Sequence, residues 1–227
     1  MIPGVISSQR SSEADDVALP GEGVGIAAGT GAATGVGARI AASAGSATAT
    51  GAAAGVSGEW LVAFSTTPSV NVFGQSTLNA RQHIASSVLT ASGSKFRLTL
   101  TASTSTEGCH IGHMYAGHAA SSGDAFDFDG TQVEVKVSTA TSFLVPQGGS
   151  VVTDENIYTF DASKNFIVAM YFDSAPNDSV GAKTALTGAT YYFKVTADEV
   201  ATTNVTGYSN SGTTSTTRLL MKIEVWG

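Results

Sequence analysis

The feature that most restricts the fold is the apolar run NFIVAMYF at residues 165–172. From residue 166 to residue 172, apolar side chains occupy both the even and the odd positions. Successive side chains of a strand point to opposite faces of a sheet, so this segment would be apolar on both faces. A strand of that kind is covered on both sides. We therefore predict that residues 165–172 form the central strand of a sheet.

The segments before this run also have the pattern of strands separated by tight turns. Valine alternates with glutamate and lysine over residues 133–137, which is typical of a half-buried strand. A second apolar segment, residues 142–145, ends at Pro146, and Gly148 and Gly149 allow the chain to reverse. This arrangement predicts an antiparallel, all-β architecture.

Further strands are predicted on both sides of this region. The clearest is residues 95–102, KFRLTLTA, where Phe96, Leu98 and Leu100 share one face. Other candidates are residues 60–64, 78–89, 110–119, 190–196 and 218–226. The total is eight or nine strands without an amphipathic helix, which predicts an antiparallel β-sandwich of jelly-roll type.

The first quarter of the chain has a different composition. Residues 1–20 have the character of an irregular leader, and residues 21–58 consist almost entirely of Gly, Ala, Ser and Thr in a degenerate repeat. Each glycine costs a helix roughly 1 kcal/mol relative to alanine, so a helix is not expected there. The tract is either a flexible linker or an extended, ordered arm. We place the boundary of the β domain at Gly58, giving a domain over residues 59–227.

Composition and charge exclude several functions. Charged residues are 13% of the chain, against roughly 25% in typical proteins, and the net charge is −7, so nucleic-acid binding is not expected. The N-terminus lacks the apolar core of a signal peptide, and no run approaches the ~20 apolar residues of a membrane span. The polar, threonine-rich composition nevertheless suits proteins that work outside cells. A virion component, made in the host cytoplasm and released by lysis, satisfies both conditions.

One cluster of possible metal ligands comprises Cys109, His110 and His113, with His118 nearby. On a regular strand, Cys109 and His113 would share a face and His110 would point the other way. The spacing matches no common zinc motif. We therefore expect a packed or hydrogen-bonded strand here and no metal. Because Cys109 is the single cysteine, an intrachain disulfide is excluded.

A second cluster, Asp124, Asp127 and Asp129 followed by Gly130, resembles part of a calcium-binding loop. The full ligand spacing and the terminal glutamate are missing, and aspartates that form turns explain the same residues. The sequence therefore predicts no metal, no cofactor and no cofactor-binding residues.

Nothing in the sequence selects a catalytic site. A nucleophile elbow is not recognisable, and four loop carboxylates offer no obvious glycosidase pair: Asp154, Glu155, Asp198 and Glu199. We therefore predict a protein that is not an enzyme. Four tyrosines offer a surface for stacking sugars, although most are expected to fill the core or a subunit interface: Tyr171, Tyr191, Tyr192 and Tyr208.

The order of short motifs over residues 78–172 resembles the N-terminal jelly-roll accessory domain of SGNH-type esterases. The matching residues are Arg81-Gln82, Arg97, Ile111-Gly112, VPQG at 145–148, VVTD at 151–154 and IVA at 167–169. The catalytic half of such esterases is missing, since Gly123-Asp124 is followed by Ala125 and no Gly-Asp-Ser elbow occurs. The resemblance implies a jelly roll that binds carbohydrate or assists a separate esterase.

The organisation of the chain also resembles that of phage virion proteins of the tail-fibre and head-decoration types. We therefore expect a bacteriophage structural protein of the capsid, neck or tail that is attached to other virion proteins by its N-terminal arm. The tract at residues 21–58 cannot bury enough apolar surface to fold alone. We expect it to become ordered against neighbouring subunits, with a homotrimer favoured. The alternative is a carbohydrate-binding module for a host-surface glycan or for a separate esterase.

Overall fold

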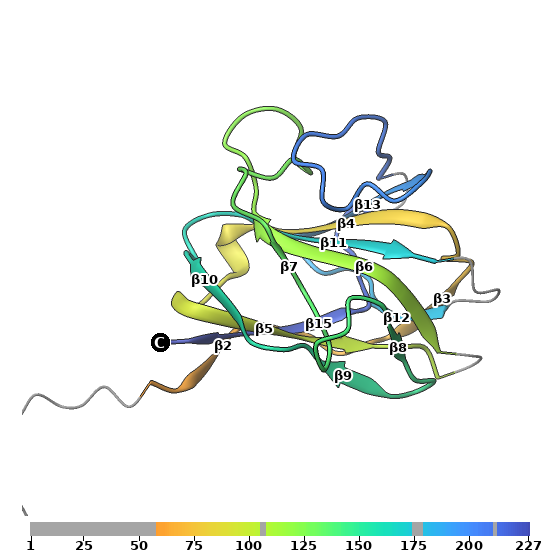
Figure 1. The fold of residues 1–227 in the computed structure, drawn as a ribbon, viewed down its shortest axis with the longest axis horizontal. Coiled ribbons are helices and arrows are strands. Elements are labelled where there is room, and N and C mark those ends of the chain that lie inside the picture. Colours follow the sequence, from red (N-terminus) through yellow and green to blue (C-terminus); the bar gives the residue numbers. More distant parts are fainter. Residues whose placement is uncertain (1–57, 105–107, 174–178, 211–212) are drawn as a thin grey trace, which may run out of the picture. The chain divides into compact units, whose positions relative to one another are not determined.

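A computed structural model describes residues 58–104, 108–173, 179–210 and 213–227. These residues form an all-β domain of antiparallel sheets (Figure 1). The leader predicted at residues 1–20 and all but the last residue of the arm predicted at residues 21–58 lie outside the described residues, so those assignments stay predictions. Within the described ranges, no helix is long and apolar enough to span a membrane.

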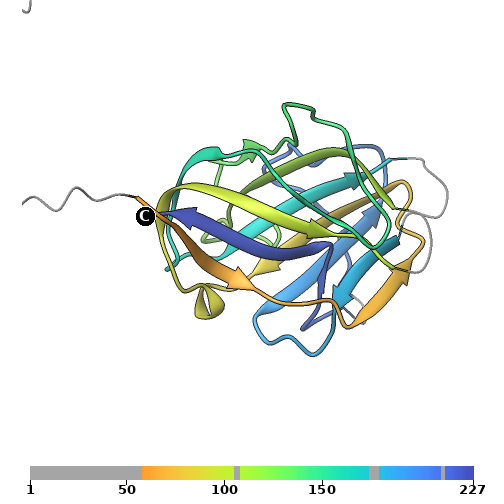
Figure 2. The ribbon, with the colours of Figure 1, turned by 90° about the horizontal axis from the view of Figure 1, so that it is seen from below.

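Two larger sheets face each other (Figures 1 and 2). The β5 sheet has the order β10 (Asn156–Phe160), β5 (Gly93–Thr101), β15 (Leu220–Trp226), β2 (Trp60–Ser65), and β9 (Ser150–Val152) also pairs with β5. The β11 sheet has the order β13 (Ala189–Val195), β4 (Leu78–Ile84), β11 (Phe166–Phe172), β6 (Cys109–His118), β7 (Val133–Glu134), and β8 (Phe143–Val145) pairs with β6. A small third sheet contains β14 (Thr217–Arg218), β12 (Ser179–Lys183) and β3 (Val70–Phe73). The predicted sandwich-like, antiparallel architecture is therefore confirmed.

Strand β11 has the central position that its sequence predicts. It lies between β4 and β6, and its even-numbered residues belong to the main core between the two sheets. On its opposite face, Ile167 and Ala169 belong to a second, smaller apolar cluster with Phe128 and Val200. Both faces of β11 are thus covered, which is why its sequence does not alternate between apolar and polar residues.

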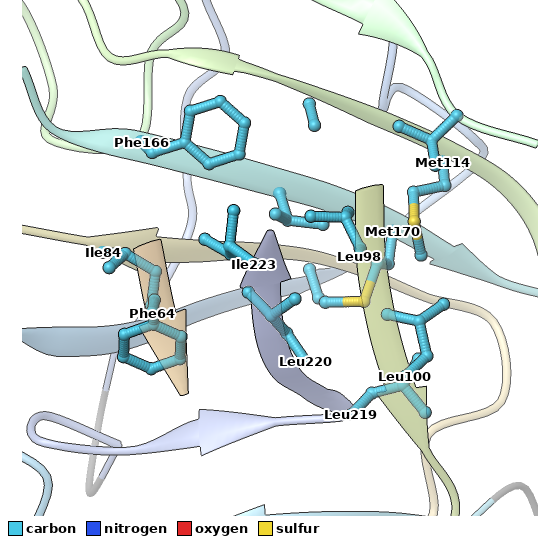
Figure 3. Close-up of a cluster of buried hydrophobic side chains, with 14 of the residues drawn as sticks. Phe64, Ile84, Leu98, Leu100, Met114, Phe166, Met170, Leu219, Leu220 and Ile223 are labelled. Carbon is cyan, nitrogen blue, oxygen red and sulfur yellow. The ribbon is translucent and has the colours of Figure 1, made fainter. Parts of the chain in front are cut away.

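The main core contains side chains from both larger sheets (Figure 3). Leu98 and Leu100 of β5 and Ile223 of β15 come from one sheet, and Met114 and Met170 come from the other. All five are fully buried. Burying each such side chain contributes roughly 1.5–3 kcal/mol, so this cluster is the main source of the domain's stability.

Several predicted strands differ from the observed ones in length. Strand β4 ends at Ile84 and is followed by a short 3-10 turn at Ser86–Val88, and the segment predicted at residues 218–226 is interrupted at Leu219, where φ is +61°. The described residues form fourteen strands, more than the eight or nine expected. Strands β3, β9, β10 and β12 were not predicted because three to five residues are too few for a clear alternation.

A matched pair of substitutions tests the position of β11. Val168→Asp places a carboxylate at a fully buried site in the core, and we expect the free energy of unfolding to fall by at least about 4 kcal/mol. Ile157→Asp on β10 is the control, because Ile157 is 83% exposed and its replacement should cost less than about 0.5 kcal/mol. Urea unfolding of both variants measures this. Similar stabilities would contradict the central position of β11.

Candidate functional site

Two long loops cover part of the outer face of the β11 sheet (Figure 1). One connects β6 to β7 and is called here the 119–132 loop; the other follows β13 and is called the 196–210 loop. Phe128 from the first loop and Val200 from the second are buried against Ile167 and Ala169 of β11. The two loops therefore cover the outer face of the central strand β11.

Arg81 of β4 holds the two loops together beneath the surface. Its side chain is fully buried; Nη1 donates to the carbonyl of Phe126 at 3.2 Å, and Nη2 donates to the carbonyls of Thr202 at 2.6 Å and Glu199 at 3.3 Å. The guanidinium carbon lies 4.4 Å from the ring centroid of Phe128. Burial lowers the pKa of Arg81, but an arginine keeps its proton in proteins. Hydrogen bonds from a cation to three loop carbonyls fix both loops to one strand.

The neighbouring polar residues of β4 have similar structural roles. Asn79 donates to the carbonyls of Thr196 at 3.0 Å and Ala197 at 2.8 Å, which fixes the start of the 196–210 loop. Gln82, on the core-facing side of β4, donates to the carbonyl of Thr216 at 3.0 Å and accepts from a backbone N–H of β14. The Arg81-Gln82 pair is therefore a structural element with one residue serving each face of the sheet.

The cysteine and histidines of β6 are not brought together. Tyr171 of β11 pairs with His113, but Phe172 pairs with Ile111, so Gly112 is an extra residue that forms a β-bulge. The bulge reverses the alternation of faces along β6. Cys109 is consequently buried in the main core, while the side chain of His113 is 45% exposed on the outer face. The prediction that Cys109 and His113 share a face is wrong for this reason.

The outer face of β6 and its neighbours carries a group of polar and aromatic side chains. We call His113, Tyr115, Glu134, Tyr171 and Asp198 the β6 surface cluster. Tyr171 is the cross-strand partner of His113, and Glu134 is the cross-strand partner of Tyr115. His113 Nδ1 lies 2.6 Å from Asp198 Oδ2, and because a carboxylate only accepts, this bond places the proton on Nδ1.

Two of the three loop aspartates that suggested a calcium loop, Asp127 and Asp129, accept hydrogen bonds from backbone N–H groups. Asp127 accepts from the N–H groups of Asp124 at 3.1 Å and Val205 at 2.9 Å, and Asp129 accepts from the N–H of Thr131 at 3.0 Å. Among the described residues, no group of three or more histidine, cysteine, aspartate or glutamate side chains is placed to hold a metal ion. The observed contacts are those of turn-forming aspartates.

The four remaining candidate carboxylates all have partners within the domain. Asp154 accepts from the backbone N–H groups of Ser138 at 2.8 Å and Thr139 at 2.7 Å. Glu155 forms an ion pair with Lys95 at 3.1 Å, and Glu199 forms one with Lys194 at 3.1 Å. Asp198 accepts a hydrogen bond from His113 Nδ1 at 2.6 Å. These contacts account for all four as loop or surface residues.

The four candidate tyrosines lie in three different environments. Tyr191 is fully buried and donates to Gln75 Oε1 at 2.9 Å, so it fills the core. The rings of Tyr192 and Tyr208 pack against Phe126, with centroid distances of 5.1 and 5.2 Å. Tyr171 is the member that belongs to the β6 surface cluster.

Sequence reasoning missed a hydrogen-bonded chain that begins at the buried His118 and runs to the surface at Asp129. His118 Nε2 accepts from the N–H of Asp161 at 3.1 Å, so Nδ1 carries the proton and donates to Tyr158 Oη at 2.8 Å. Tyr158 Oη lies 2.9 Å from Thr131 Oγ1, which donates to Asp129 Oδ1 at 2.6 Å. Nothing in the sequence distinguishes His118 from His110 or His113, because its partners come from distant segments.

We compared the sequence with protein-family models and with curated proteins, and neither comparison found a match. The resemblance to the accessory domain of SGNH-type esterases stays a prediction.

Replacing Arg81 tests whether it holds the loops. Arg81→Met keeps an unbranched apolar chain but removes the guanidinium group, which leaves three loop carbonyls without their donor. We therefore expect the free energy of unfolding to fall by about 3 kcal/mol and a protease to cut within residues 196–210. Arg97→Met is the matched control, because Arg97 pairs with Glu224 at a partly exposed site and its loss should cost about 1 kcal/mol. Equal effects of the two substitutions would show that the loops are held by other contacts.

The environment of His118 predicts a stability that depends on pH. Burial lowers the pKa of His118, so the unfolded chain, with a pKa near 6.5, takes up the proton first as the pH falls. Protonation also removes the acceptor for the N–H of Asp161. Stability should therefore be complete above about pH 6.5 and decrease below it, until the pH reaches the pKa of the folded state.

Urea unfolding between pH 7.5 and 5 measures this effect. His118→Phe should be less stable than the wild type at pH 7.5 and should lose less stability on acidification. Burial also lowers the pKa of His83, so His83→Gln is the variant that separates the two contributions. An unchanged pH dependence in His118→Phe would assign the effect to other groups.

Proposed function

We propose that this protein is a non-enzymatic structural protein of a bacteriophage virion, of the capsid-decoration, neck or tail-fibre type. In this proposal, residues 1–58 attach it to other virion proteins, and the β domain, of jelly-roll type, is displayed. The protein is made in the host cytoplasm and released within the particle. The low charge content and the threonine-rich composition support this assignment.

The observation that carries the proposal is the way residues 58–60 join the domain. Glu59 and Gly227 exchange two backbone hydrogen bonds of 3.2 Å, and the rings of Trp60 and Trp226 are in edge-to-face contact, with centroids 5.5 Å apart. A Cβ atom at Gly58 would lie 2.2 Å from Trp226 Nε1, so a larger residue would require the Trp226 ring to move. A force applied to the segment before residue 58 would thus be transmitted into β2 and β15 of the β5 sheet. This arrangement suits a domain that is attached through its N-terminal side.

The use of buried polar groups also supports a structural role. Arg81, Asn79, Gln82 and Asp127 direct their hydrogen bonds at the backbone of loops and strands. Active sites, in contrast, hold polar groups ready for a substrate. We propose a homotrimer, because the Gly/Ala-rich tract needs neighbouring chains to bury its small side chains.

Complementation of a phage that lacks the gene tests this proposal. Full-length chain should be incorporated into particles, whereas residues 59–227 should remain soluble, fold cooperatively and be absent from particles. Light scattering of the full-length chain should give three times the mass of one chain. Incorporation of residues 59–227 at full occupancy would place the attachment site in the β domain, and a monomeric full-length chain would contradict the trimer.

A further inference from the structure

We propose that the β6 surface cluster is a binding site for a neutral oligosaccharide. This inference goes beyond the proposed structural role and rests on it only in that the β domain is displayed.

The tyrosines supply the apolar part of the site. Tyr115 of β6 and Tyr171 of β11 are on the same face of the sheet, since Tyr171 pairs with His113, two residues before Tyr115. Both are half-buried, because they also pack against the small cluster of Phe128, Ile167, Ala169 and Val200. That packing restricts the rings before a ligand arrives, which lowers the entropic cost of binding. The C–H faces of a sugar ring pack against such aromatic rings.

The polar groups beside the tyrosines are mainly acceptors. His113 donates its Nδ1 proton to Asp198, and the rest of its imidazole ring stands on a side chain that is 45% exposed. The carboxylates of Asp198 and Glu134 are 30% and 29% exposed. Burial and the nearby carboxylates raise the pKa of Tyr115, which keeps its hydroxyl group as a donor. Such a surface matches the many hydroxyl donors of a sugar.

Charge restricts the class of glycan. Glu134 and Asp198 are acidic, and Lys136, which pairs with Glu134 at 3.0 Å, is the cation beside them. The whole chain carries a net charge of −7. An anionic glycan containing uronic or sialic acid would therefore be repelled, and a neutral chain is favoured.

The proposed site gives a reason for the β-bulge at Gly112. Without the bulge at Gly112, the alternation of β6 would place His113 on the same face as Cys109, in the core. A Cβ atom at Gly112 would lie 3.0 Å from Tyr171 Cδ1, so glycine also permits the close approach of that ring. The bulge thus places His113 beside Tyr171, which is consistent with the tendency of bulges to direct side chains at functional sites.

Titration of the full-length chain with sugars tests the inference. The probes are hexasaccharides of glucose, mannose and N-acetylglucosamine, with hexagalacturonate as the anionic comparison, observed by saturation-transfer NMR and calorimetry. We expect at least one neutral probe to bind and hexagalacturonate to bind at least tenfold more weakly. Tyr115→Ala with Tyr171→Ala should weaken binding at least tenfold, whereas the two Tyr→Phe changes should retain most of it.

Matched variants distinguish the site from general effects. Phe73→Ala removes an aromatic ring that is 54% exposed on β3, outside the cluster, and should bind like the wild type. Asp198→Asn and His113→Gln alter exposed polar groups, so they carry the test if the double alanine variant does not fold. The inference is overturned if no neutral probe binds at millimolar concentration, if binding survives all cluster variants, or if hexagalacturonate is preferred. Because these measurements use purified protein, their failure is distinguishable from a failure of incorporation into particles.

Discussion

A strand that is apolar on both faces requires a cover on each side, and the architecture of this domain follows from that requirement. The β5 sheet covers one face of β11. The other face is covered by two loops, and loops carry backbone groups that must find partners when they are buried. Arg81 supplies three of those partners from inside the sheet. The apolar character of β11 and the buried charge of Arg81 are therefore two parts of one structural solution.

The fold could be predicted from the sequence where burial leaves a periodic signal. The alternation of Phe96, Leu98 and Leu100 and the unbroken run in β11 both report directly on which faces are covered. Short strands such as β9 and β12 are formed by pairing with neighbours, and their sequences alone carry little information. The break at Leu219 was not predicted either, since a leucine with positive φ has no sequence signal.

The candidate site could be predicted less well because it depends on one extra residue. The sequence shows a cluster of possible metal ligands at residues 109–113, but a regular strand places Cys109 and His113 on one face, and only the register of β6 against β11 shows the bulge between them. His118 and its partners illustrate a second difficulty: Tyr158, Thr131 and Asp161 are far from it in sequence. Hydrogen bonds that connect distant segments follow from topology, which local patterns do not specify.

The contact between Trp60 and Trp226 has a spectroscopic consequence. These are the two tryptophans of the chain, and both lie where residues 58–60 meet the last strand. Tryptophan emission therefore reports on this edge of the β5 sheet, while the main core contains phenylalanine and tyrosine but no tryptophan. A change in emission without a change in circular dichroism would mean that β2 has separated from β15 while the rest of the domain stays folded. The chain thus contains a natural optical reporter for the place where residues 58–60 join the β domain.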